Sequence, residues 1–324
     1  MPPADLVCLV SDPDGFDDRG LNASALDGLT VAASELPIRV AEFETATEAD
    51  IPVVLSDAVS AECTLIFTVG YRMADATVAL AGAHAETTFV ILDFAYPSSL
   101  ANLKGVTFAT QEAAYLAGYA AAALSKTDRI GTYGGVPIPT VMSSMSGFSQ
   151  GAMRYADDQD VSVTVDGWVP RDPATSTFIG GFDDAGAART ITQAQLSDGS
   201  DVIYPVAGSA GLGTLEEIAG REESAAAVWN DTDGCLSLPE SCRFILTSVV
   251  KHLDAMVLQT TKAFLDGTLD NQVGVGTLAN SGVDIAPFRD FEALLPVSAR
   301  ARITELRQAI IDGDIIVEPV LPLA

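Results

Sequence analysis

The chain has 324 residues, 48% hydrophobic and 19% charged, which is enough material for about two domains with buried cores. Its 44 acidic residues outnumber its 17 lysines and arginines, so the formal net charge is −27. This charge argues against nucleic acid or an anionic membrane surface as a partner. The sequence has neither an apolar run of the roughly 18 residues that cross a bilayer nor a signal-peptide pattern at its start. The protein is therefore either cytosolic or directed by a targeting segment outside this sequence.

The four cysteines favour an oxidising, extracytoplasmic location. Cys235 and Cys242 bracket a short proline-containing loop, and we predict a disulfide between them. Cys8 and Cys63 each lie at or inside an apolar strand, where a second disulfide and two buried free thiols both remain open. Because the chain lacks a CxxC pair and has only two histidines, we predict no metal site and no cofactor.

The first structured stretch reads as a strand, a polar turn and a helix. The run Leu6–Val10 is apolar without alternation, as in a parallel strand covered on both faces. A loop from Ser11 to Gly20 holds four aspartates, and helical spacing follows up to Leu29. Such loops lie at the carboxyl edge of a parallel sheet, where ligands bind, although a solvated acidic turn has the same pattern.

Strands and helices alternate through the first third of the chain, which predicts a doubly wound parallel sheet with right-handed crossovers. Pro52 falls in the first turn of a predicted helix, where its missing N–H costs nothing. The predicted strands are Leu6–Ser11, Ile38–Phe43, Leu65–Val69, Thr88–Leu92 and an edge strand Ala101–Phe108, and the helices are Ser24–Ala33, Asp50–Val59 and Met73–His84.

A long helix, Gln111–Leu124, opens a second set of the same units. Its predicted strands are Ile130–Tyr133, Ser162–Trp168, Val202–Val206 and Ala225–Asn230, with helices at Ser144–Tyr155 and Ala185–Leu196. After it come Phe244–Thr247, the helix His252–Leu265 and a tail, Val273–Ile316, whose pieces return to the two lobes. We therefore expect an N-terminal lobe of 1–107 with about 240–280, a C-terminal lobe of 108–239 with about 281–324, and a ligand cleft between them.

A glycine-rich turn, Ala207–Gly213, follows a predicted strand and precedes a helix. It lacks the glycine order and the acidic residue of a dinucleotide fingerprint. Its backbone amides at Gly208 and Gly211 could receive an oxygen of a small ligand. A tight turn that needs a left-handed backbone explains the same glycines equally well.

Carboxylates recur at the ends of the predicted strands, where they suit hydrogen bonding to neighbouring sugar hydroxyls. Lys251 follows an apolar strand and needs a partner if it is drawn inward, although it could equally be a solvated lysine. The carboxylates are Asp12, Asp93, Asp231 and Asp233.

A planar ligand needs aromatic faces for stacking, although most aromatic residues in a chain of this size belong to the core. His84 and His252 have no metal-ligand spacing, and the sequence has no GxSxG or phosphate-loop motif. Aromatic residues near the predicted strand ends are Phe16, Tyr71, Phe94, Phe182, Tyr204 and Trp229.

The order of segments resembles the basic membrane protein, or PnrA-like, family of lipoproteins that deliver purine nucleosides to ABC importers. The matching runs extend from Asp17 to Ala255. They are DDRGLNASALDGL, TLIFTVGYRMADA, TTFVILD, ATQEAAYLAGYAAA, IGTYGGVPIPTVMSSMSGFSQGA, SDVIYPVAGSAGLG and ILTSVVKHLDA. The resemblance implies an α/β type I periplasmic-binding-protein fold, with two Rossmann-like lobes joined by a three-strand hinge.

The resemblance also implies ligand contacts. The family loop Asp-x-Ser-Phe-Asn falls on Asp18, Gly20, Leu21 and Asn22, so a leucine replaces one stacking aromatic residue. Carried over in the same way, Tyr204 is the second stacking residue, Asp231 holds the ribose hydroxyls, Lys251 donates to the ribose, and Gly208 to Gly211 approach the sugar. Asp93 and Asn22 are expected to contact the base, and Tyr71 or Phe16 to supply the missing aromatic face.

We therefore predict an extracytoplasmic receptor that binds a purine or similar nucleoside for an ABC importer and performs no chemistry. Its expected partners are the nucleoside and a membrane permease, and we expect a monomer held at the membrane only by a lipid anchor outside this sequence. Two alternatives remain: a nucleoside hydrolase that uses Asp231 or Asp93 as an acid or base, and a receptor of the same fold for a free base or a flavin.

Overall fold

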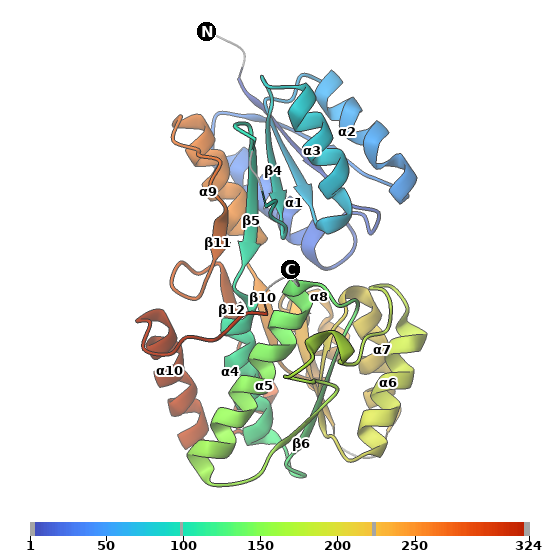
Figure 1. Cartoon of the computed structure of the whole chain (residues 1–324), viewed down its shortest axis with the longest axis vertical. Coiled ribbons are helices and arrows are strands. Elements are labelled where there is room, and N and C mark those ends of the chain that lie inside the picture. Colours follow the sequence, from blue (N-terminus) through green and yellow to red (C-terminus); the bar gives the residue numbers. More distant parts are fainter. Residues whose placement is uncertain (1–3, 98–99, 222–224, 321–324) are drawn as a thin grey trace. The chain divides into compact units, whose positions relative to one another are not determined.

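The computed structural model describes residues 4–97, 100–221 and 225–320 of the chain. The chain forms two compact units, which Figure 1 shows in sequence colours. The first unit comprises Met1–Phe108 and His252–Gly276, and the second comprises Ala109–Lys251 and Thr277–Ala324. The chain therefore passes from one unit to the other three times. In the described ranges, no helix combines the length and the apolar character that a membrane span requires.

The first unit is built on a six-stranded sheet in which all strands are parallel, with the order β11-β5-β4-β3-β1-β2. α1 packs against α9, and α2 packs against α3. A Cβ at Gly28 of α1 would overlap the backbone of Asp254 in α9, so glycine permits this close approach. The strands are β1 (Leu6–Val10), β2 (Arg39–Phe43), β3 (Leu65–Val69), β4 (Thr88–Leu92), β5 (Leu103–Phe108) and β11 (Gly274–Gly276). The helices are α1 (Leu21–Glu35), α2 (Ile51–Ser60), α3 (Ala74–Ala83) and α9 (Leu253–Leu265).

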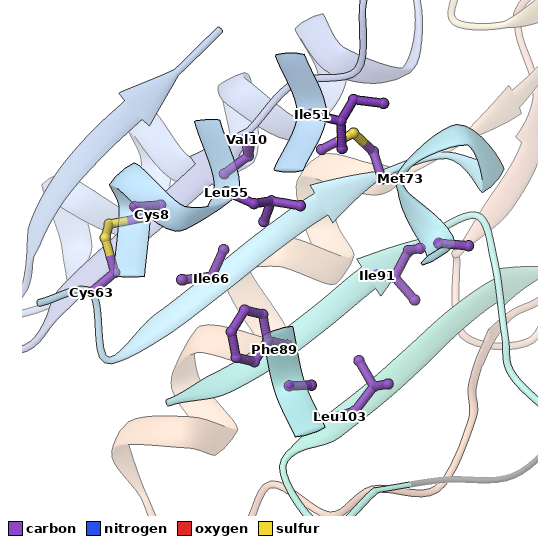
Figure 2. Close-up of a cluster of buried hydrophobic side chains, with 13 residues drawn as sticks. Cys8, Val10, Ile51, Leu55, Cys63, Ile66, Met73, Phe89, Ile91 and Leu103 are labelled. Atoms are coloured by element: carbon purple, nitrogen blue, oxygen red, sulfur yellow. A yellow bond between two sulfur atoms is a disulfide. The ribbon is translucent and has the colours of Figure 1, made fainter. Parts of the chain in front are cut away.

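A core of buried apolar side chains lies between this sheet and α2 and α3 (Figure 2). Leu55 of α2 and Phe89 of β4 are fully buried within it. Cys8 and Cys63, which the sequence left open, form a disulfide in this core, with their Cα atoms 6.0 Å apart. The bridge joins β1 to the segment that leads into β3, the strand that pairs with β1.

The second unit has a sheet of the order β12-β10-β9-β8-β6-β7, in which only β12 is antiparallel to its neighbour. α4 packs along α5 through glycines: a Cβ at Gly118 would overlap the Phe148 carbonyl, and a Cβ at Gly151 would overlap the Tyr115 carbonyl. The strands are β6 (Arg129–Gly134), β7 (Thr164–Asp166), β8 (Val202–Val206), β9 (Ala226–Asp231), β10 (Ile245–Lys251) and β12 (Val283–Ile285). The helices are α4 (Thr110–Leu124), α5 (Pro139–Gln159), α6 (Ala185–Ser197), α7 (Leu212–Ala219), α8 (Gly234–Ser237) and α10 (Val297–Ile311).

The structure differs from the expected lobe boundaries around residues 240–251. These residues belong to the second unit rather than to the N-terminal lobe, because β10 pairs with β9 and is buried along its whole length. β10 is also longer than the predicted Phe244–Thr247. The predicted strand Ala101–Phe108 is not the edge of its sheet, since β11 pairs with β5 beyond it.

Candidate ligand-binding site

The glycine turn after β8 forms a short 3-10 helix, Gly208–Gly211, at the carboxyl end of the strand. Gly208 has a φ of 55°, and a Cβ there would lie 3.3 Å from Phe182 Cβ. A Cβ at Gly211 would lie 3.1 Å from the ring of Trp229. The backbone N–H of Ala210 donates to the Phe182 carbonyl at 2.8 Å. Both a left-handed backbone and close aromatic packing therefore require these glycines, and the turn is held against the loop that carries Phe182.

Asp231 and Lys251 end the neighbouring strands β9 and β10 and form an ion pair. Lys251 Nζ lies 3.1 Å from Asp231 Oδ1, and the two side chains are 8% and 12% exposed. Buried ions of opposite charge need each other, because each one alone carries a desolvation cost of several kcal/mol. The sequence predicted both residues at a sheet edge, and the structure brings them together.

Asp231 also has an unusual backbone, with a φ of 69°. Asp93, which directly follows β4, has a φ of 60°. β4 and β9 hold the same position, third in the strand order, in their respective sheets. A left-handed non-glycine residue costs about 1 kcal/mol or more and is found often at functional sites. Each unit therefore places one such aspartate at the corresponding strand end.

Tyr204 does not fit the expected role of a stacking residue, because its ring is fully buried in the second unit. Its centroid lies 5.0 Å from that of Phe148. The hydroxyl donates to Asn230 Oδ1 at 2.7 Å and bonds Ser144 Oγ at 2.7 Å. Burial raises the pKa of Tyr204, so the phenol stays protonated. The alternation of side chains along β8 turns this residue into the core, and its polar end serves the neighbouring strand.

Phe182 is the aromatic residue that lies at this edge instead. Its side chain is half-buried, and its ring atoms lie close to where Cβ atoms at Gly208 and Gly135 would be. Asp184, two residues later, accepts a hydrogen bond from Ala187 N and caps α6. The signal in the sequence was its position: Phe182 follows Gly180 and Gly181 and precedes Asp184, a residue type typical of a helix N-cap. This position places the aromatic side chain at the start of a helix, near the edge of the sheet.

In the first unit, Asp18 holds the start of α1. Its carboxylate accepts hydrogen bonds from the backbone N–H groups of Gly20, Asn22 and Ala23 at 2.8, 2.9 and 3.0 Å. These bonds satisfy amides that have no partner within a first helical turn. Burial of the carboxyl group raises the pKa of Asp18. The carboxylate that we expected to contact a ligand is therefore used to form the loop.

Asn22 has the same structural use, with a residue exposure of 1%. Its Nδ2 donates to Asp12 Oδ1 at 2.8 Å and to Asp18 Oδ2 at 3.0 Å, and its Oδ1 accepts from Asp12 N at 3.1 Å. The amide thus has a partner for each of its hydrogens inside the loop. This arrangement differs from the expected contact between Asn22 and the base.

Arg72 is a polar residue of this loop cluster that sequence reasoning missed. Its Nη2 and Nε donate to Asp12 Oδ2 at 2.7 and 3.1 Å, and it also pairs with Asp14. Although partial burial opposes it, the charges of Asp12 and Asp14 raise the pKa of Arg72. An arginine three residues after the apolar strand β3 was the available signal. The preceding residue, Tyr71, is 40% exposed, while Leu21 is half-buried.

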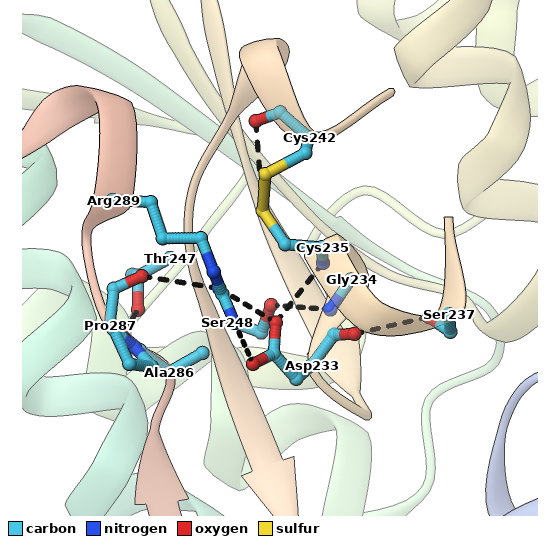
Figure 3. The surroundings of a disulfide bond; sticks show 10 residues. All are labelled: Asp233, Gly234, Cys235, Ser237, Cys242, Thr247, Ser248, Ala286, Pro287 and Arg289. Atoms are coloured by element: carbon cyan, nitrogen blue, oxygen red, sulfur yellow. Dashed lines mark hydrogen bonds and ion pairs between the residues drawn. A yellow bond between two sulfur atoms is a disulfide. The ribbon is translucent and has the colours of Figure 1, made fainter. Parts of the chain in front are cut away.

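A disulfide-closed loop lies between Asp231 and Lys251 in the chain (Figure 3). Cys235 and Cys242 are bonded, with Cα atoms 4.5 Å apart. Asp233 accepts hydrogen bonds from Arg289 Nη1 and Nη2 at 2.9 and 2.5 Å and from Cys235 N at 3.1 Å. Asp233 therefore fixes this loop, in contrast to the sugar contact considered from its place at a strand end.

The second unit thus collects a carboxylate, an ammonium group, a glycine turn and an aromatic side chain at the carboxyl ends of adjacent strands. This arrangement can hold a polar, partly planar solute. Over the residues that the structure describes, no group of three histidine, cysteine or acidic side chains could hold a metal ion.

Comparison with known proteins identifies the family. A family model described as ABC transporter substrate-binding protein PnrA-like matches residues 6–294. The chain belongs to this family. Its members are substrate-binding proteins and not enzymes, which removes the hydrolase alternative. As an ABC transporter substrate-binding protein, the chain acts outside the cytoplasm with a solute and a membrane permease as partners.

Curated relatives and solved structures agree with this assignment. Basic membrane protein A of Borreliella afzelii is 30% identical over 308 residues, which cover 93% of this chain and 88% of that protein. A Lactococcus lactis protein named ABC transporter nucleoside-binding protein BmpA is 29% identical, covering 96% and 88%. An ABC transporter solute-binding protein of Aeropyrum pernix K1 has a TM-score of 0.83 at 22% identity, covering 96% and 92%. The expected periplasmic-binding-protein fold is confirmed.

Proposed function

We propose that this substrate-binding protein binds a nucleoside, with the ribose held at the carboxyl ends of β9 and β10. The observation that carries the proposal is the ion pair between Asp231 and Lys251. A carboxylate can accept hydrogen bonds from two neighbouring ribose hydroxyls, and an ammonium group can donate to a ribose oxygen. The name of the L. lactis relative, ABC transporter nucleoside-binding protein BmpA, supports the same ligand class.

The groups beside this pair suit the other features of a nucleoside. The glycine turn Gly208–Gly211 lies at the carboxyl end of β8, beside the strand ends that carry Asp231 and Lys251. The half-buried ring of Phe182 packs beside Gly208 and suits a planar base. Phe182 takes the stacking role that we first expected of Tyr204. In the first unit, Tyr71 and Asp93 stay predictions that their own variants must test.

We further propose that the protein is a monomer and is attached to the outer face of the membrane by a lipid anchor. The family resemblance supports the anchor, and the acidic net charge of −27 makes attachment through an anionic lipid surface unfavourable. A receptor held in this way delivers its solute to the permease without spanning the bilayer.

Isothermal titration with adenosine, guanosine, inosine, cytidine and uridine tests the proposal. We expect saturable one-to-one binding of at least one purine nucleoside, and a loss of about 100-fold in affinity for Asp231→Asn, because the hydrogen bonds to a charged acceptor weaken. Asp157→Asn, at an exposed position of α5, is the matched control and should bind as the parent does. Binding of hypoxanthine, adenine or riboflavin in place of every nucleoside would replace this proposal with the free-base or flavin alternative.

A further inference from the structure

Asn230, the residue before Asp231 in β9, carries a side-chain amide at the edge of the candidate site. The side chain is half-buried. Its Oδ1 accepts a hydrogen bond from the Tyr204 hydroxyl at 2.7 Å. No other residue within the described ranges bonds the amide, so both hydrogens on Nδ2 lack a protein acceptor. Nδ2 is not one of the fully buried polar atoms that lack a partner, so this nitrogen is accessible to solvent.

A buried hydrogen-bond chain from Ser144 through Tyr204 to Asn230 fixes the orientation of this amide. Tyr204 is fully buried, and its hydroxyl bonds Ser144 Oγ of α5 at 2.7 Å as well as Asn230. With Ser144 as donor to the phenolic oxygen, the phenol hydrogen points to Asn230 Oδ1. Turning the amide over would make the Tyr204 hydroxyl accept from Nδ2 and donate to Ser144 Oγ. The buried Ser144 hydroxyl would then have no acceptor among the described residues, which costs about 1 kcal/mol or more. The chain therefore keeps the carbonyl end inward and the NH₂ end outward.

The position of the amide connects it with the candidate site. Asn230 and Asp231 are consecutive at the end of β9. This strand lies between β8, which carries Tyr204 and leads into the glycine turn, and β10, whose Val249 and Val250 pair with Asn230 and Asp231. Nδ2 is a fixed donor without an acceptor in the protein, at the same strand end as Asp231. Such a donor favours ligands that carry a hydrogen-bond acceptor at the matching position. Sites built to hydrogen-bond a ligand atom reject analogues that lack it more strongly than apolar pockets do.

We propose that Asn230 is a specificity-determining residue, whose Nδ2 donates to a hydrogen-bond acceptor on the bound nucleoside, and that Tyr204 and Ser144 are positioning residues for it. This inference rests on the proposed function. The acceptor is an oxygen or a ring nitrogen of the ligand, either on the base or on the ribose.

The variant Asn230→Asp isolates the donor. It keeps an oxygen for the Tyr204 hydroxyl and replaces the NH₂ group with a second, charged oxygen, so thermal unfolding is measured together with binding. Asn230→Ser removes the NH₂ group without adding a charge, so a similar loss in both variants separates the missing donor from repulsion between the new carboxylate and Asp231. We expect at least a tenfold loss of affinity by isothermal titration. Asn280→Asp is the control: its Oδ1 accepts from Thr277 N at 2.7 Å in an exposed turn of the same unit, and its affinity should not change.

The role of Tyr204 is tested by a double-mutant cycle with Tyr204→Phe. If the hydroxyl acts through Asn230, Tyr204→Phe lowers affinity about threefold in the parent and has no effect in the Asn230→Asp background. A purely structural role would give the same loss in both backgrounds. Asn230→Ser, whose hydroxyl can still accept from Tyr204, replaces Asn230→Asp if that variant does not fold.

Nucleoside analogues show whether the acceptor for Nδ2 lies on the base or on the ribose. The Asn230→Asp loss should shrink for 7-deaza or 6-amino nucleosides if the acceptor is on the base, and for 2′- or 3′-deoxy nucleosides if it is on the ribose. A parent protein that binds no nucleoside would overturn the proposed function and this inference with it. A parent that binds one, together with an Asn230→Asp variant within twofold of it, would overturn only the role of Asn230.

Discussion

Lys251 Nζ lies 3.1 Å from Asp231 Oδ1, and the two charged side chains are 8% and 12% exposed. Each charge offsets the desolvation cost of the other, and neither is fully compensated alone. The same two groups are the ones that we propose to bind the ribose. Stability and ligand affinity are therefore coupled at the ends of β9 and β10, and variants can separate them.

Lys251→Met keeps the length of the side chain and removes its charge. The Asp231 carboxylate is then buried without its cation, so we expect the free energy of unfolding to fall by about 3 kcal/mol in urea denaturation. Combining it with Asp231→Asn removes the unpaired charge and should restore most of that loss. Neither protein should regain nucleoside affinity, and a Lys251→Met protein that binds as the parent does would contradict the role of Lys251.

The two disulfides should differ in their contribution to stability. Cys8 and Cys63 are 55 residues apart, and Cys235 and Cys242 are 7 apart. Since loop-closure entropy grows with loop length, replacing the first pair by alanine should cost about 4 kcal/mol and the second about 2.5 kcal/mol. Denaturation of the two double variants, each under oxidising conditions, measures the difference. Equal losses would show that loop entropy does not decide the order.

Gly118→Ala tests the close packing of α4 on α5. A Cβ at this position would overlap the Phe148 carbonyl, so the helices must separate and we expect a loss of about 2 to 3 kcal/mol. Gly82→Ala in α3 is the matched control, because its nearest neighbour would be a Leu100 side-chain carbon at 3.9 Å. That helical glycine should gain up to about 1 kcal/mol on substitution. Two variants with the same midpoint would contradict the account of helix packing.

Leu21→Phe restores the aromatic residue that the family loop carries. Leu21 is half-buried at the first position of α1, and Tyr71 is exposed after β3. If this loop contacts the base, we expect purine nucleoside affinity to rise about threefold to tenfold, as stacking contributes about 1 kcal/mol. Titration of the variant against the preferred purine measures this. An unchanged affinity would mean that the family loop pattern is wrongly aligned here.

Acid should weaken the first unit through Asp254. The hydrogen bond from His252 is the main cause that lowers the pKa of Asp254 below its usual value. A depressed carboxyl pKa contributes stability above the unfolded-state value, and this contribution is lost as the pH falls through the folded-state value. Relative to Asp254→Asn, the parent should therefore lose stability between about pH 5 and about pH 3. Parallel curves for both proteins across that window would contradict this contribution.

The sequence allowed most of the fold to be predicted, because parallel strands covered on both faces are continuous apolar runs. The end of β10 was harder. Thr247 and Ser248 interrupt the apolar run, so pattern alone ended the strand at Thr247, whereas β10 continues to Lys251. The partner of Cys8 was also undecided, since strand pairing and not sequence distance brings Cys63 to it.

The candidate site was less predictable than the fold. Asp231 and Lys251 could be named because charged residues after apolar strands are unusual. Tyr204 was assigned to stacking from the family resemblance, and the sequence does not reveal that its hydroxyl bonds Ser144 and Asn230. The hydrogen bonds of Asn22 to Asp12 and Asp18, which use its amide inside the loop, were equally invisible in the sequence.

A crystal structure of the protein with the purine nucleoside that binds most tightly is the most direct test. The account predicts two ribose hydroxyls within hydrogen-bond distance of the Asp231 carboxylate and a ribose oxygen within that distance of Lys251 Nζ. A nucleoside bound with its ribose away from both groups, or bound elsewhere on the chain, would contradict it.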